Sequence, residues 1–172
     1  MKRFILPLIL ALSFYFEGVF AQVFSAKAFH GERILAPHFL LAILIFMAIY
    51  YIRNNTLWYA LLFGLLYDVF FTEIIGINLF LFPAAVYLTT KVMKVLQSNV
   101  FIAILVALLN MAAVEFIVYQ FYRLIGHVQM TMVDFVDIRL WPTLILNLAF
   151  LIIVAFPLKR WLMFWRKELL DD

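Results

Sequence analysis

Three carboxylates lie inside apolar stretches of this 172-residue chain, and they are the residues best placed to do chemistry. Glu17, Asp68 and Glu115 are each surrounded by aliphatic and aromatic residues. A carboxylate at bilayer depth is costly, so it normally faces protein or water and marks something functional. Paired acids carry protons in membrane proteins, which makes Asp68 with Glu115 one candidate for a proton relay.

No other pattern in the sequence is typical of an enzyme. The motifs HExxH, GxSxG and the Walker loop do not occur. Cysteine is absent, which excludes a thiolate nucleophile and a cysteine metal site. The three histidines, His30, His38 and His127, fall in or beside predicted loops, and the three serines have no nearby base. We therefore expect no enzymatic activity and no catalytic, cofactor or metal site.

The composition predicts an all-α, polytopic membrane protein. The chain is 68% hydrophobic and 13% charged, against roughly 45–50% and about 25% in soluble domains. No soluble fold of this length can bury so much apolar surface. The net charge of +3 is modest, and no stretch has the basic density of a nucleic-acid binder. We expect one transmembrane domain covering residues 1–172 and no nucleic-acid partner.

Six apolar segments are candidates for transmembrane helices, each of which needs about 20 apolar residues. The predicted spans are approximately residues 4–23, 34–52, 56–71, 74–90, 100–122 and 140–158. Only Thr72 and Glu73 separate the third span from the fourth, which predicts a tight helical hairpin.

The distribution of basic residues predicts the orientation. When loops are assigned to alternate sides, nine of the 13 Lys and Arg residues fall on one side. These nine are Lys2, Arg3, Arg53, Lys91, Lys94, Lys159, Arg160, Arg166 and Lys167, and the other four are Lys27, Arg33, Arg123 and Arg139. The positive-inside rule then predicts a multi-pass protein of the cytoplasmic membrane with both termini in the cytoplasm.

The first span also resembles a secretory signal, because Val19-Phe20-Ala21 forms a small-residue cleavage pattern. We expect this span to be retained, since it carries Glu17 and a polytopic protein needs no removable signal.

The polar residues of the spans gather in the outer half of the bilayer. At about 1.5 Å per helical residue, the three carboxylates lie roughly 18–22 Å from the cytoplasmic face. Asn147 and Arg139 lie on the same outer side, so we group Glu17, Glu115, Asn147 and Arg139 as an outer-half polar cluster. Two interpretations remain open. The groups pair with one another and lock the helices together, or they line a cavity or docking surface open to the outside.

Gly64 and Asp68 are one turn apart and share a helix face. Gly64 lets a neighbouring helix approach closely, and Gly76 relaxes the backbone as the next span begins. Plain helix packing explains these three residues as well as a partner interface does.

The run Gly64-Leu-Leu-Tyr-Asp68, followed by Gly76 in the next span, resembles the rod-shape-determining MreD family. The opening Met-Lys-Arg-Phe, the span from Phe39 to Met47 and the ending Arg166-Lys-Glu-Leu169 resemble its Gram-positive-type members. The resemblance covers essentially the whole chain, and its most specific element is the Gly-x-x-x-Asp run with the downstream glycine.

This resemblance implies a non-enzymatic scaffold of the cell-elongation complex, or elongasome, of a bacterium. Its partner would be an MreC-like single-span protein, which links it indirectly to MreB filaments, to RodA and to a class B penicillin-binding transpeptidase. These proteins act in lateral peptidoglycan synthesis and rod shape. The resemblance also implies a fold similar to the substrate-binding subunits of energy-coupling-factor transporters, contact with membrane lipid, and a homodimer as one arrangement within the complex.

Two alternatives remain open at this stage. A small-molecule-binding transporter subunit fits the size and span count, although the run Ala11-Leu-Ser-Phe-Tyr15 departs from the Ala-x-x-x-Ala pattern of such subunits. The second alternative is a lipid-handling protein whose outer polar groups hold a lipid head group.

Overall fold

The computed structural model describes residues 5–24, 33–72, 74–96 and 99–171, and these residues form helices and no strand. In chain order the helices are α1 (Ile5–Phe24), α2 (Phe39–Tyr50), α3 (Arg53–Phe71), α4 (Ile77–Val92), α5 (Val100–Leu124), α6 (Met132–Asp134), the π-helical η2 (Phe135–Leu140) and α7 (Trp141–Asp171). The all-α prediction is therefore confirmed for the described part of the chain.

Three stretches of the described residues are long and apolar enough to cross a membrane. They are Ile5–Val23, Val100–Leu124 and the continuous stretch Met132–Glu168. Helices α2 and α4 are also apolar but have only 12 and 16 residues. At about 1.5 Å per residue, α2 rises about 18 Å, which is well below the roughly 30 Å of bilayer hydrocarbon.

Helix α2 is shorter than the predicted span 34–52 because residues 33–38 are not helical. Pro37 disfavours helical geometry at the residue before it. The segment instead pairs with the last helix: the N–H of Ile34 donates to the carbonyl of Ile138 (2.9 Å), and the N–H of Ala36 donates to Thr143 Oγ1 (3.1 Å). The backbone groups that a helix would satisfy internally are thus satisfied by η2 and α7.

Helix α2 forms the centre of the bundle. Ten of its residues are buried, and it packs against α1, α3, α4, α5 and α7. A helix that is apolar on every side needs neighbours on every side. The sequence Phe39–Tyr50 contains no charged residue, so its burial requires no compensating ion pair.

The largest remaining differences from the predicted helix ends are in α3, α4 and α7. Helix α3 begins at Arg53 rather than at residue 56. Helix α4 begins at Ile77 rather than at residue 74, since Gly76 adopts a left-handed conformation (φ 119°) and ends the preceding turn. Helix α7 continues through Pro157 to Asp171, so the basic residues that follow the predicted span 140–158 belong to the same helix.

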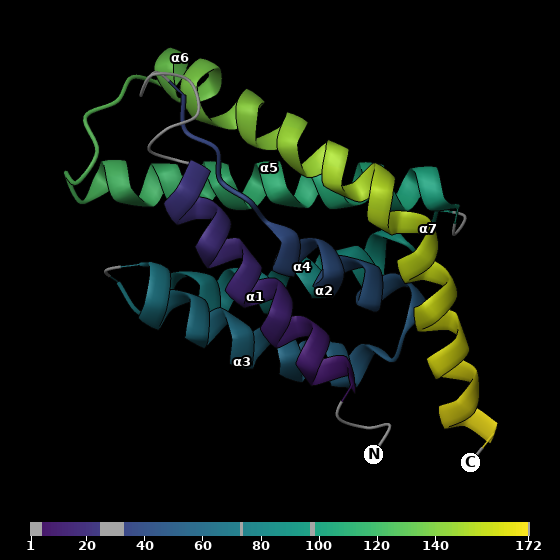
Figure 1. Cartoon of the computed structure of the whole chain (residues 1–172). Coiled ribbons are helices and arrows are strands. Elements are labelled where there is room, and N and C mark those ends of the chain that lie inside the picture. The colour runs from purple at the N-terminus through teal and green to yellow at the C-terminus, as the bar shows by residue number, and fades with distance from the viewer. Residues whose placement is uncertain (1–4, 25–32, 73, 97–98, 172) are drawn as a thin grey trace.

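Figure 1 shows two ends of the bundle. The start of α1, the end of α7 and the α2–α3 connection lie at one end, which we call the terminal end. The α3–α4 turn and the connection between α5 and α6 lie at the other, which we call the outer end. Helices α3 and α4 pack along each other as a hairpin, and α5 packs against both α4 and α7.

Candidate functional site

Asp68 is fully buried in α3, and its carboxylate accepts hydrogen bonds from the beginning of α4. Oδ2 accepts from the N–H groups of Gly76 (2.8 Å) and Leu79 (2.9 Å). Oδ1 accepts from the N–H of Asn78 (2.9 Å) and from its side-chain amide (3.0 Å). These backbone donors have no partner within the helix, and no other side chain caps α4. We call this arrangement the Asp68 cap.

Two glycines complete the Asp68 cap. A Cβ atom at Gly64 would lie 2.5 Å from the carbonyl oxygen of Asn78, so only glycine allows α3 and α4 to approach this closely. Gly76 supplies the positive φ that brings its own N–H toward Asp68. The run Gly64-x-x-x-Asp68 with Gly76 therefore forms one structural unit, the α3–α4 hairpin.

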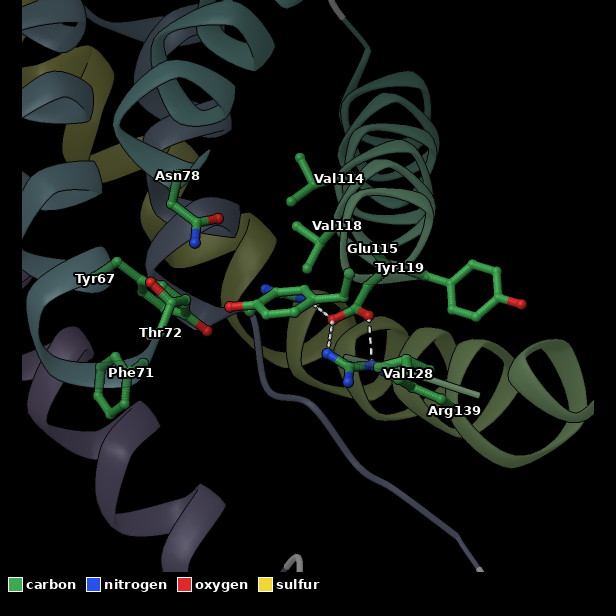
Figure 2. Close-up of a pocket in the computed structure, with 12 residues that line it drawn as sticks. Tyr67, Phe71, Thr72, Asn78, Val114, Glu115, Val118, Tyr119, Val128 and Arg139 are labelled. Carbon is green, nitrogen blue, oxygen red and sulfur yellow. Dashed lines mark hydrogen bonds and ion pairs between the residues drawn. The ribbon is translucent and has the colours of Figure 1, made fainter. Parts of the chain in front are cut away.

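Glu115 of α5 is buried and interacts with two other side chains at the outer end. Arg139 donates from Nε to Oε2 (2.7 Å) and from Nη2 to Oε1 (3.4 Å). His38 Nε2 lies 2.7 Å from Oε1. Figure 2 shows the dashed contacts between Glu115 and Arg139. These residues join α5, η2 and the start of α2, and a buried carboxylate needs such partners. We call this set, together with Asn147, the Glu115 network.

Asn147 and Thr143 of α7 hold the non-helical segment 33–38 in place. Asn147 accepts from the N–H of His38 at Oδ1 (2.8 Å) and donates from Nδ2 to the carbonyl of Ala36 (3.0 Å). Both side chains are fully buried. Because His38 contacts both Glu115 and Asn147, this backbone segment connects α5 to α7.

Glu17 of α1 reaches the same region from another side. Its Oε2 accepts the N–H of Leu40 in the first turn of α2 (2.9 Å), which ties α1 to the central helix. Its Oε1 and Nδ1 of His38 are buried without a hydrogen-bond partner among the described residues.

A cavity of about 300 Å³ lies between the α3–α4 hairpin and the Glu115 network. In Figure 2, Tyr67, Phe71, Thr72 and Asn78 lie on one side of it. Val114, Glu115, Val118, Tyr119 and Arg139 come from the opposite side. The Arg139 side chain is 35% exposed, whereas that of Glu115 is 3% exposed.

The structure places the predicted residues in two separate groups. Glu115 and Arg139 are in direct contact, and Asn147 joins them through His38. Glu17 caps α2, and the hydrogen bonds of Asp68 all lie within its own hairpin, so no direct contact links Asp68 to Glu115 as a relay. The sequence placed His38 in or beside a loop, which agrees with the non-helical segment 33–38, but its contact with Glu115 was not predicted. Its position directly after Pro37 and before an apolar helix was the available signal.

Asp68 and Glu115 both connect elements of the bundle. No group of three His, Asp or Glu side chains among the described residues can hold a metal ion. The carboxylates of Asp68 and Glu115 accept from fixed partners on both oxygens. In this arrangement the carboxylates accept hydrogen bonds that would otherwise be missing at buried helix ends.

Fold and site together define an all-helical membrane protein in which buried carboxylates connect the helices. Sequence comparison identifies the family. The model of the rod shape-determining protein MreD matches residues 2–165. The chain is 37% identical over 172 residues to the rod shape-determining protein MreD of Bacillus subtilis (strain 168), with 100% of both chains covered. The chain therefore belongs to the MreD family, which determines rod shape.

No solved structure matches this chain. The expected similarity to the substrate-binding subunits of energy-coupling-factor transporters is therefore not supported by comparison, and it carries no further argument.

Proposed function

We propose that this chain is a non-enzymatic membrane scaffold of the bacterial cell-elongation complex and associates with an MreC-like single-span protein. Through that partner it acts with MreB filaments, RodA and a class B penicillin-binding transpeptidase to position or regulate lateral peptidoglycan synthesis. The family assignment supports the role in cell shape. The observation that carries the scaffold role is that Asp68 and Glu115 are both used to connect helices.

The proposed topology has six membrane crossings with both termini in the cytoplasm. The terminal end of the bundle carries the start of α1 and the end of α7, and the sequence pattern assigns nine of the 13 Lys and Arg residues to the side of the termini. The short α2 fits a crossing because the extended segment 33–38 adds length at the outer end.

The proposed contact surface for the MreC-like protein lies at the outer end, around η2 and the segment 33–38. Arg139 is the part of the Glu115 network that reaches the surface. Val133 on the adjoining α6 is 70% exposed. Asp68 is fully buried, so it contributes to this surface only by fixing the α3–α4 hairpin.

Site-specific photocrosslinking in growing cells tests this proposal. A photoreactive residue at Val133 is expected to crosslink to a single-span protein with an external coiled coil. The same residue at Ile153, which is 74% exposed in the middle of α7, serves as the matched control and is expected to give at most a weak crosslink. Equal crosslinking from both positions would refute the proposed surface.

Variants separate the role of the surface from that of the fold. When recovery is normalised to folded protein, Arg139→Ala and Glu115→Ala are expected to lower co-purification of the MreC-like protein several-fold. If Asp68→Ala and Glu115→Ala both leave that association and rod shape intact, the scaffold assignment fails. Recovery of an ATPase module instead would favour a transporter.

A second candidate function is a small-molecule-binding membrane transporter subunit. The observation in its favour is the cavity of about 300 Å³ beside Glu115 and Arg139, a volume at the lower end of the range for small-molecule sites. A purified protein that carries one stoichiometric organic ligand, lost on Arg139→Ala, would support this function over the scaffold.

A further inference from the structure

Several hydrogen-bond donors at the α2–α3 connection have no acceptor. Helix α3 begins at Arg53 without a capping side chain and without an acidic residue in its first turn. The first N–H groups of a helix have no partner within it, and they favour anions. Nε of Arg53 and the hydroxyl of Tyr50 are also buried without a partner, and Tyr50 is only 4% exposed. Backbone N–H groups of α3 and side-chain donors of Arg53 and Tyr50 therefore both lack an acceptor at this corner of the terminal end.

Three cations surround this corner, each from a different helix. The Arg53 guanidinium lies 5.0 Å from the centre of the Tyr87 ring, and the Lys91 ammonium lies 5.4 Å from the same centre. The Lys159 ammonium lies 5.3 Å from the centre of the Tyr50 ring. Cation–π contacts stabilise each charge, but two cations on one ring also repel each other.

The stretches of sequence around these cations contain no acid to neutralise them. Residues 33–67, 74–114 and 138–167 include no Asp or Glu, and no described ion pair involves Arg53, Lys91 or Lys159. The next acid along α7 is Glu168, which lies about 14 Å along the helix axis from Lys159. These stretches therefore supply no negative charge to the corner, and an anion from outside them would complement its charge.

An apolar groove continues from the corner along the hairpin. A groove of about 450 Å³ begins at Asn54, next to Arg53, and is lined further on by Leu57, Trp58, Leu61 and Pro83. Trp58 is 72% exposed at this level, and tryptophan is enriched at the depth of lipid head groups. A ligand that fits both features has an anionic head and an apolar tail.

We propose that this corner binds the phosphate of an anionic phospholipid, with one acyl chain along the groove. Arg53, Lys91 and Lys159 supply the positive charge, and the first N–H groups of α3 with the Tyr50 hydroxyl donate to the phosphate oxygens. Helix N-termini bind phosphate in this way, and basic pockets between helices on the inner face bind anionic head groups. The site is distinct from the outer-end Glu115 network and does not depend on the proposed partner.

Native mass spectrometry of the delipidated full-length protein tests the site, with phosphatidylglycerol and phosphatidylcholine as probes. Phosphatidylglycerol is expected to remain bound in preference to phosphatidylcholine. Since each basic residue near the surface contributes about 1 kcal/mol, or roughly fivefold, Arg53→Gln and Lys91→Gln should each weaken phosphatidylglycerol binding about fivefold. Lys94→Gln is the matched control, because Lys94 is exposed on the same side without a ring contact.

Two further variants distinguish loss of binding from loss of folding and show whether the phosphate belongs to a lipid. Tyr50→Phe keeps the ring and removes only the hydroxyl, and it should lower phosphatidylglycerol binding measurably. Leu61→Trp should fill the groove and weaken lipid binding while leaving competition by inorganic phosphate unchanged. If inorganic phosphate competes effectively and Leu61→Trp does not change phosphatidylglycerol binding, the ligand of this site is a soluble phosphate compound and not a lipid. No preference for phosphatidylglycerol, or an equal loss in Lys94→Gln, would overturn the site.

Discussion

The Asp68 cap and the Glu115 network both bury one carboxylate, but they satisfy it in opposite ways. Asp68 accepts mainly from backbone N–H groups eight to eleven residues further along the chain. Glu115 accepts from the side chains of His38 and Arg139, which are 77 and 24 residues away. The first arrangement is local and is part of a helix end, whereas the second is assembled only when distant elements pack together.

This difference has an energetic consequence. Backbone donors are fixed once α4 forms, so the Asp68 cap immobilises few additional side chains. The Glu115 network must order the long Arg139 side chain, which is 35% exposed, and this ordering costs conformational entropy. We therefore expect the free energy of unfolding to depend more on Asp68 than on Glu115.

The largest expected effect is that of Asp68→Ala. The substitution leaves the buried N–H group of Asn78 and the partly buried N–H groups of Gly76 and Leu79 without their acceptor. Because an unsatisfied buried donor costs about 1–3 kcal/mol, we expect a loss of about 3 kcal/mol or more in the free energy of unfolding. Denaturant titration of the purified protein in mixed micelles measures this value.

Asp68→Asn is the control for Asp68→Ala. Its amide keeps one oxygen but places an NH₂ group opposite backbone donors, so at least half of the loss should remain. Wild-type stability for Asp68→Asn would contradict the hydrogen-bond geometry of the Asp68 cap.

The next effect is expected for Gly64→Ala, which tests the close packing of the same hairpin. The new Cβ would lie 2.5 Å from the backbone carbonyl oxygen of Asn78, which cannot move without displacing α4. Overpacking of this kind costs about 1–3 kcal/mol. Gly18→Ala is the matched control, because its Cβ meets the ring of Phe71 at 2.9 Å and a side chain can rotate away. Equal melting temperatures for the two variants would show that the α3–α4 contact is not limiting.

A smaller effect is expected for Gly76→Ala, which tests the backbone conformation alone. A Cβ at Gly76 meets nothing within 4 Å, so the cost comes from the φ of 119°. Strained backbone at a non-glycine residue costs about 1–3 kcal/mol. Gly126→Ala also meets nothing within 4 Å and has a φ of 78°, closer to the conformation that other residues adopt. Gly76→Ala should therefore lower the melting temperature more than Gly126→Ala, and the reverse order would refute this explanation.

The same local character explains what the sequence predicts well. The tight α3–α4 hairpin and the shared helix face of Gly64 and Asp68 follow from the sequence. The capping of α4 by Asp68 was not predicted, because depth alone grouped this carboxylate with Glu115. The all-α class follows from composition alone. Packing as the reason for Gly64 was also available, because small residues allow close approach of membrane helices.

The contacts between residues far apart in the sequence could not be predicted in this way. The pairing of Glu115 with Arg139 was one of several options, and the role of His38 depends on the non-helical segment 33–38 beside α7. Pro37 indicated a break in the predicted span, but nothing local shows that Thr143 and Asn147 satisfy the freed backbone groups. The 12-residue length of α2 follows from that long-range pairing.

The smallest expected effect is the coupling within the Glu115 network, which tests the other side of the comparison. A double-mutant cycle with Glu115→Gln, Arg139→Gln and the double variant isolates the interaction energy. Because side-chain contacts between helices in membrane proteins average below 1 kcal/mol, we expect a coupling of about 1 kcal/mol or less. His38→Gln in the Arg139→Gln background should raise the total loss further, since Glu115 then loses both partners. A coupling above the loss caused by Asp68→Ala would reverse the comparison and make the distant network the main stabilising element.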